Sequence, residues 1–299
     1  MNPTPDLPVL PYGTISPEFE NLLAATINKA DREWPAKWQA YQGAAYIVES
    51  CARIALNTHQ SLRYLCAQEP PRPERKVEFA LSAIPVVRSL VDMVFLLVFV
   101  FEDLPARSSW YLKAGWREEA EELARYKALY GDDPDWKEWL AGSEGALAEA
   151  QVLAAVSPTE AANPKSLPYW PIPSGMLKSK KLSSEAQTFL EHLNDWFYRS
   201  FSSYTHLSLP GLVMRSAGLR PARGEEEERI RQWRVDKQRS DAVGMEILMC
   251  LAIMSEIDAA CGFGLHTRLR YIWGVLGGFF GYARDLYRMR YDKLLASGT

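Results

Sequence analysis

The run from Phe79 to Phe101, FALSAIPVVRSLVDMVFLLVFVF, is apolar on nearly every face of a helix. Such a helix either crosses a membrane or forms the centre of a protein core. Two opposite charges, Arg88 and Asp92, lie inside it, and each costs about 2.5 to 3.5 kcal/mol at the centre of a membrane span. The uninterrupted apolar part, Met93 to Phe101, is too short to cross a bilayer. We therefore expect a buried core helix.

The rest of the chain is also patterned as helix. Apolar residues recur with a period of 3.6, and strand signals are nearly absent. With 299 residues, of which 47% are hydrophobic, the chain can bury a sizeable core. We predict an all-α multi-helix bundle of about eight or nine helices in a single domain over 1–299. An extended N-terminal arm over 1–15 and a long packed loop over 157–184 complete it.

Capping residues, prolines and glycines set the expected helix boundaries. The expected helices are Ser16 to Glu33, Lys37 to Gln68, Glu74 to Phe101, Ala106 to Tyr130, 133 to 156, Ser184 to Ser202, Glu225 to Cys261 and Thr267 to Leu295. Ser16 and Pro17 should be the N-cap and first residue of the first helix. Pro85 should kink the third helix or mark a break in it. The glycine row from Gly274 to Gly281 should let the last helix cross a neighbour closely, and it favours a homodimer face.

The net charge of the chain excludes no class of binding partner, but charged residues are unevenly distributed along the sequence. The net charge of −3 and the pI of about 5.9 carry no global signal for nucleic acid or an anionic membrane. Residues 165–239 carry 13 Lys and Arg against 8 Asp and Glu, whereas residues 102–138 carry 6 against 10. This is compatible with a basic groove, although a solvated face is the favoured interpretation.

Cysteine spacing and the N-terminus bear on cofactors and location. The four cysteines lack the two-residue spacing of zinc or redox sites, so we interpret them as reduced core residues. The first residues, MNPTPDLPVLPYG, have neither the basic region nor the apolar region of a signal peptide. We expect a cytoplasmic protein with no metal, no cofactor and no membrane contact.

Two groups of polar residues are candidates for a site. Arg88 and Asp92, at i and i+4, share a helix face and should form a structural ion pair; the alternative is the polar floor of a pocket. The segment 196–209, WFYRSFSSYTHLSL, can place Ser202 and His206 on one face. No nucleophile-elbow glycines flank Ser203, which argues against serine hydrolysis. A hydrogen-bonded or helix-capping His206 is the structural alternative.

The spacing of Arg199 and His206, with six residues between them, resembles the motif of the HEPN superfamily. These are small helical bundles, many of them metal-independent ribonucleases. Arg53 and His59 have a similar spacing, but they lie before the usual position of the motif. In such chemistry His moves the proton of the ribose 2′-hydroxyl while Arg stabilises the charged phosphorane. The resemblance implies that Arg199 and His206 are catalytic and that RNA is the partner.

Three segments in order resemble a family of uncharacterised bacterial all-helical proteins. They are VVRSLVDMVF, YWPIPSGMLK and FYRSFSSYTHLSLPG, within roughly Lys76 to Leu212. The resemblance implies that Arg88, Asp92, Trp170, Ser203 and His206 converge on one pocket. We expect Tyr204, which lies between Ser203 and His206, to belong to the same pocket. Some such helical families are found in toxin or phage-defence settings, so the resemblance implies a HEPN-like role by analogy only. HEPN domains are typically much shorter than this chain.

Three hypotheses for function follow. The first is a HEPN-like ribonuclease or defence effector that uses Arg199 and His206, with Arg88 and Asp92 behind them. The second is a non-catalytic binding or assembly module in which the Arg, Asp and His cluster only fixes helix packing. The third is a small-ligand sensor, which requires a pocket lined by tryptophans.

Overall fold

The computed structural model describes residues 12–39, 41–66, 82–179, 181–199, 202 and 223–296. These ranges are helical and contain no strand, which confirms the all-α prediction. The helices are α1 (Tyr12–Arg32), α2 (Gln42–Leu65), α4 (Ala83–Phe101), α5 (Leu104–Tyr130), α6 (Lys137–Leu153), α7 (Pro158–Ala162), α8 (Pro173–Leu177), α9 (Ser184–Leu193), α12 (Glu225–Cys261), α13 (His266–Phe279), α14 (Gly281–Leu286) and α15 (Asp292–Leu294). Single π-helical turns follow α9 at Asn194–Tyr198 and α14 at Tyr287–Tyr291.

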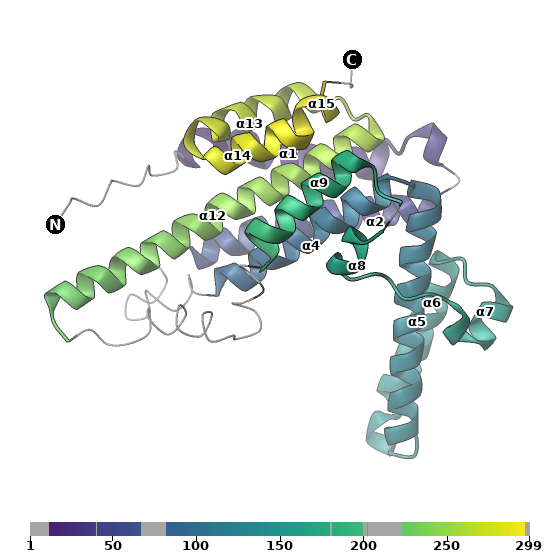
Figure 1. Ribbon diagram of the computed structural model, residues 1–299. Helices are drawn as coiled ribbons and strands as arrows, with labels where there is room; N and C mark the ends of the chain where they lie inside the picture. The colour runs from purple at the N-terminus through teal and green to yellow at the C-terminus, as the bar shows by residue number, and fades with distance from the viewer. Residues whose placement is uncertain are drawn as a thin grey trace.

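Helix α4 is the centre of the bundle, between α2 and α12 (Figure 1). Most of its residues are buried, from Ala83 at its start to Val100 at its end. In the described part of the chain, α4 is the one helix long and apolar enough to cross a membrane, and 67% of that apolar stretch is covered by the chain's own elements. The apolar run is therefore packed as a core helix within this fold.

Helices α5 and α6 form an antiparallel arm that projects from the bundle (Figure 1). The Asp103 carboxylate caps α5 by accepting a hydrogen bond from the Ala106 amide at 3.4 Å, and Pro105 fits the first turn. At the tip, the rings of Tyr130 and Trp136 stack with centroids 4.2 Å apart. The arm is thus anchored at one end by the bundle and closed at the other by aromatic packing.

The segment 157–184 is less irregular than the sequence indicated, because it contains the short helices α7 and α8. Ser157 and Glu160 form a capping box at the start of α7. Leu167 is buried against the arm, and Trp170 packs on the bundle, whereas Ile172 stays exposed. The segment therefore runs across the junction between bundle and arm.

Several helix starts differ from the expected ones; α2, for example, begins at Gln42 rather than Lys37. Helix α1 already begins at Tyr12, so residues 12–15 are not extended and Pro17 lies inside the helix, where it removes one internal hydrogen bond. Residues 1–11 of the predicted extended N-terminal segment lie outside the described residues. Helix α4 begins at Ala83, which places Pro85 in the first turn, where the missing N–H has no helical partner to lose. Residues 67–81 lie outside the described ranges.

The predicted last helix is broken. Phe280 takes an extended conformation (φ −122°, ψ 117°), and the chain bends there between α13 and α14. At Gly277 an added Cβ would lie 3.5 Å from the Arg284 Cβ, so this glycine faces the bend. Gly274 and Gly278 have open space beside them, so within the described chain they make no close helix crossing, contrary to the prediction.

Candidate functional site

The predicted ion pair between Arg88 and Asp92 forms on α4, and its two ends differ in exposure. The Arg88 side chain is 11% exposed, whereas that of Asp92 is 48% exposed. Burial raises the pKa of Asp92, and the nearby Arg88 guanidinium opposes that rise. The Arg88 Nε is buried and has no hydrogen-bond partner among the described residues. The cation is thus sealed inside the fold while the carboxylate reaches the surface.

Tyr198, rather than Arg199, covers this pair. The Arg88 guanidinium lies over the Tyr198 ring, 3.6 Å from its centroid, and Phe95 meets the same ring edge-on. The π turn at Asn194–Tyr198 widens the helix, so that Phe197 is buried and Tyr198 also faces α4. Arg199 is 73% exposed and pairs with Asp195 of its own helix at 3.4 Å. The contact to Arg88 thus comes from Tyr198, while Arg199 faces solvent on its own helix.

The other predicted site residues of this segment are Ser203, Tyr204 and His206, and all three lie outside the described residues. The proposed meeting of His206 with Arg88, Asp92 and Trp170 is therefore still a prediction. What the described residues do show is that the chain leading into this segment contacts α4 at Arg88.

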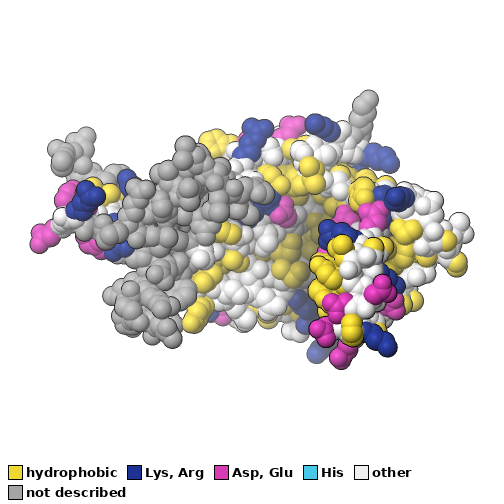
Figure 2. Space-filling view, turned by 90° about the horizontal axis from the view of Figure 1, so that it is seen from below, with side chains coloured by type: hydrophobic (Ala, Val, Ile, Leu, Met, Phe, Trp, Pro, Cys, Tyr) yellow, Lys and Arg dark blue, Asp and Glu magenta, His cyan; other side chains and the backbone are white. Residues whose placement is uncertain are grey.

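A cleft of about 640 Å³ opens beside Asp92, at the junction of bundle and arm. Its walls come from α2, α4, α5, the end of α6 and the chain from Trp170 to α8. The structure thus brings two predicted site residues, Asp92 and Trp170, to one cleft, although 77 residues separate them in sequence. Figure 2, seen from below the bundle, shows hydrophobic side chains gathered beside the arm.

Trp170 is held in place by aromatic rings from α4 and α5. It meets Phe99, Trp110 and Tyr111 edge-on, with centroids 5.4, 5.2 and 5.0 Å away. The Trp110 indole N–H donates to the Tyr169 carbonyl at 3.1 Å, which ties the neighbouring backbone to α5. Edge-on packing of this kind stabilises each ring pair by about 0.5 to 1.5 kcal/mol beyond burial, so the neighbouring rings fix the position of Trp170 in the cleft wall.

The two sides of α5 differ in charge. Glu118 and Glu119 line the cleft, and neither has a cationic partner among the described residues. On the other side, Lys113 pairs with Glu160 at 2.7 Å and Arg117 pairs with Glu121 at 2.9 Å. Lys113 and Arg117 therefore form ion pairs on the side of α5 that faces away from the cleft, whereas the carboxylates of Glu118 and Glu119 face the cleft.

The residues that α5 contributes to the cleft were not identified from the sequence. Tyr111, Gly115 and Glu118 recur at i, i+4 and i+7, so they share one face of α5, and all three line the cleft. An added Cβ at Gly115 would meet no atom within 4 Å, so the cleft is open there. The spacing of these residues indicates that they share one helix face, but it does not indicate that this face borders a cleft.

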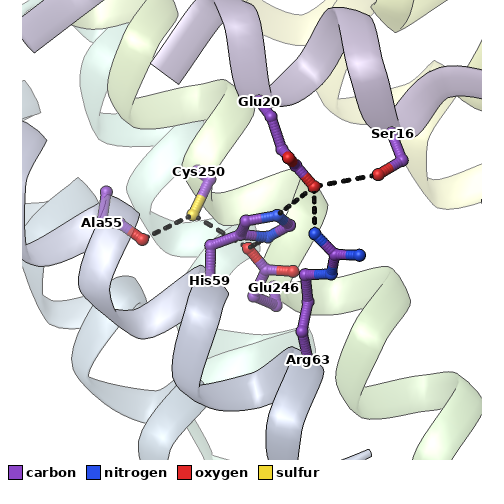
Figure 3. A network of polar contacts seen from close by, with 7 residues as sticks. All are labelled: Ser16, Glu20, Ala55, His59, Arg63, Glu246 and Cys250. Atoms are coloured by element: carbon purple, nitrogen blue, oxygen red, sulfur yellow. Dashed lines mark hydrogen bonds and ion pairs between the residues drawn. The ribbon is translucent and has the colours of Figure 1, made fainter. Parts of the chain in front are cut away.

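The second Arg and His candidate is a structural cluster (Figure 3). His59, which is 1% exposed, contacts the Glu246 carboxylate through Nδ1 at 3.0 Å, and its Nε2 lies 3.7 Å from Glu20. Arg53 lies on another face of α2, where it pairs with Glu49. Because Arg53 and His59 do not meet and the imidazole is sealed in the core, this pair does not match the ribonuclease arrangement.

Cys250 completes the same cluster. Its thiol lies 3.2 Å from the Glu246 carboxylate, and burial raises its pKa well above the ordinary value. The thiol is therefore protonated and unreactive, as expected for a core cysteine. The described residues hold no group of three or more His, Cys, Asp or Glu side chains placed to bind a metal ion.

Comparison of the chain with protein-family models, with curated proteins and with solved structures found no match.

Proposed function

We propose that this chain is a helical binding module whose cleft takes a small organic ligand. The observation that carries the proposal is that Asp92 of the core helix and Trp170 of the crossing segment meet at one cleft of about 640 Å³. Ligand sites typically enclose about 300 to 1,000 Å³ and combine apolar and aromatic walls with a few polar groups. Trp116 and Trp170 give this cleft the tryptophan walls that a ligand sensor requires.

The alternative in which the Arg and Asp pair serves only to hold the bundle together accounts for Arg88 but not for Asp92. Arg88 is nearly buried and stacked on Tyr198, as a structural residue would be. Asp92 is half-exposed and lies in the cleft wall, where a ligand can reach it. We therefore assign Arg88 to packing and Asp92 to the binding surface.

The proposal can be tested by filling the cleft. The Gly115→Phe variant projects a ring into open space, and replacing a glycine inside a helix also removes its entropic cost. The wild-type protein should bind one equivalent of Nile red, a neutral apolar dye, with a rise in dye fluorescence. Gly115→Phe should abolish this binding.

Gly142→Phe is the matched control, because Gly142 lies in α6, also has open space beside it and does not line the cleft. It should bind the dye as the wild type does, and both variants should melt at or above the wild-type temperature. If Gly115→Phe binds Nile red as well as the wild type does, the cleft is not the ligand site.

Ribonuclease activity is a second proposal, supported by the accessibility of Arg199. Its side chain is largely exposed and is held by an exposed pair with Asp195, which water and ions easily replace, so it can contact a phosphate. The net positive charge of residues 165–239 favours the approach of RNA. His206, the proposed proton carrier, follows seven residues later in the chain.

This second proposal predicts that purified protein degrades total RNA and that Arg199→Ala and His206→Ala each abolish the cleavage. The same variants should remove toxicity on expression, if the protein acts as a defence effector. Asp195→Asn is the matched control and should retain cleavage. Intact RNA after incubation with the wild type would eliminate the ribonuclease proposal and would leave the proposal that the cleft binds a ligand unchanged.

A homodimer through the exposed face of α13 is a further proposal. Gly274 and Gly278 carry no side chain and have open space beside them, so a second helix can approach the backbone closely at these two positions. Analytical ultracentrifugation of the wild type and of Gly274→Leu should show a dimer that dissociates in the variant. A wild-type monomer at high concentration would contradict it.

A further inference from the structure

The charge of the cleft is one-sided. Its lining contains the carboxylates of Asp92, Glu118 and Glu119, and no Lys, Arg or His is among the described residues that form its walls. Asp92 is partly neutralised by Arg88, but Glu118 and Glu119 have no cationic partner in the described ranges. The nearby cations of α5, on Lys113 and Arg117, are paired with other carboxylates on the opposite side of the helix. The cleft therefore presents a negative potential.

The walls between these carboxylates are aromatic. Tyr46 is exposed at the rim, and Tyr111 and Trp170 lie half-buried deeper in the cleft. An aromatic face attracts a cation through its quadrupole, and the attraction strengthens as the pair is desolvated. The chain already uses this interaction next to the cleft, where Arg88 lies 3.6 Å from the centroid of the Tyr198 ring.

We infer that the cleft selects an organic cation, an ammonium or amidinium group carried on an apolar or aromatic body. The apolar body would pack against Leu96, Trp116 and Met176, while the cationic group would lie near Glu118 and Glu119. This inference rests on the proposed binding function and specifies the class of ligand. An anion of the same shape would meet the unpaired carboxylates of Glu118 and Glu119, and the described lining offers it no unpaired cation, so it should be rejected.

The test uses three probes with one apolar body and different head groups: 4-phenylbutylammonium, 4-phenylbutan-1-ol and 4-phenylbutyrate. Isothermal titration calorimetry of the full chain at low salt should show the cation binding about tenfold or more tightly than the alcohol, and no binding of the carboxylate. Equal affinity for the three probes, or preference for the carboxylate, would overturn the inference.

A pair of substitutions locates the effect. Glu118→Gln combined with Glu119→Gln removes both unpaired carboxylates from an exposed helix face without orphaning any cation in the described chain. This double variant should bind 4-phenylbutylammonium about tenfold more weakly than the wild type, and its affinity for 4-phenylbutan-1-ol should be unchanged. Glu122→Gln is the matched control on the same helix, because Glu122 pairs with Arg125 and does not line the cleft. It should leave all three affinities within about twofold of the wild type.

The outcomes separate the two claims. If Nile red and all three probes fail to bind, the proposed binding function fails. If Nile red binds in a way that Gly115→Phe abolishes, but the probes show no preference for the cation or the double glutamine variant binds 4-phenylbutylammonium as well as the wild type, the function stands and the inference about ligand charge is wrong.

Discussion

Single residues decide which charges in this fold belong to packing and which to the surface. Spacing alone predicted the pair between Arg88 and Asp92, because i and i+4 side chains meet on any helix. The unequal exposure of the Arg88 and Asp92 side chains was not predictable from their spacing. It depends on Tyr198, which lies 110 positions further along the sequence and covers Arg88. The same limit applies to Arg199, which a π turn leaves on the exposed side.

The asymmetry of this pair predicts unequal costs of breaking it. Asp92→Ala leaves Arg88 nearly buried without its carboxylate and should lower the free energy of unfolding by about 2 kcal/mol. Arg88→Met keeps an unbranched chain over Tyr198 and leaves Asp92 half in water, so it should cost about 1 kcal/mol or less. Urea unfolding of both variants measures the difference; the opposite order would show that Asp92 is the buried partner.

A second residue-scale prediction concerns pH. The Lys113 ammonium, together with the Ser157 amide, lowers the pKa of Glu160 to about 2, from an ordinary value of 4.5. Because the folded pKa is depressed, the stabilisation by Glu160 is complete above about pH 4.5 and is lost as the pH falls through about 2. Glu160→Gln should therefore lower the melting temperature at pH 6 and have a vanishing effect near pH 2. An offset that does not change between these pH values would contradict this assignment.

At the scale of elements, helices bounded by local signals were predictable and those bounded by tertiary contacts were not. The bounds of α12 follow from four glutamates at its start and from Gly262 at its end, which takes φ +70°. The break at Phe280 has no comparable local signal, because a helix continued through 267–295 also satisfies the periodicity. Beyond the break, a buried ion pair joins the chain to α12.

This pair, Arg290 with Glu256, should anchor the C-terminal turns. Burial disfavours the charge on Arg290, but Glu256 outweighs it and raises the pKa of Arg290. Glu256→Gln leaves a buried cation without its counter-charge and should cost about 3 to 5 kcal/mol in urea unfolding. Glu256→Leu with Arg290→Met removes both charges and should cost markedly less than Glu256→Gln alone. A double variant as unstable as the single one would mean that packing, not charge, anchors this segment.

At the scale of the whole molecule, the cleft is a product of architecture. It exists because α5 leaves the bundle at an angle and the segment before α8 crosses the junction (Figure 1). Asp92 and Trp170 were singled out from the sequence, but Tyr111, Gly115 and Glu118 were not. The reason is that a polar residue on a solvated helix and one facing a cleft have the same spacing, and only the placement of another element distinguishes them.

The projecting arm predicts uneven stability. Its outer half buries few side chains, of which Leu123 and Leu140 are the main ones, whereas α4 and α12 contribute long buried stretches to the core. Hydrogen exchange in low urea should therefore show the amides of residues 125–141 opening well before those of α4, which should exchange only on global unfolding. Equal protection of the two regions would contradict an arm held mainly from its base.

The central claim, that the cleft binds a ligand, is tested most directly by fluorine NMR of protein labelled with 5-fluorotryptophan. The ten tryptophans report on separate parts of the molecule, and single Trp→Phe variants assign their signals. Titration with 4-phenylbutylammonium should shift the signals of Trp116 and Trp170, which line the cleft, and leave Trp139 on the arm and Trp273 in the core unchanged. Unchanged Trp116 and Trp170 signals at saturating probe, or shifts confined to Trp139, would contradict it.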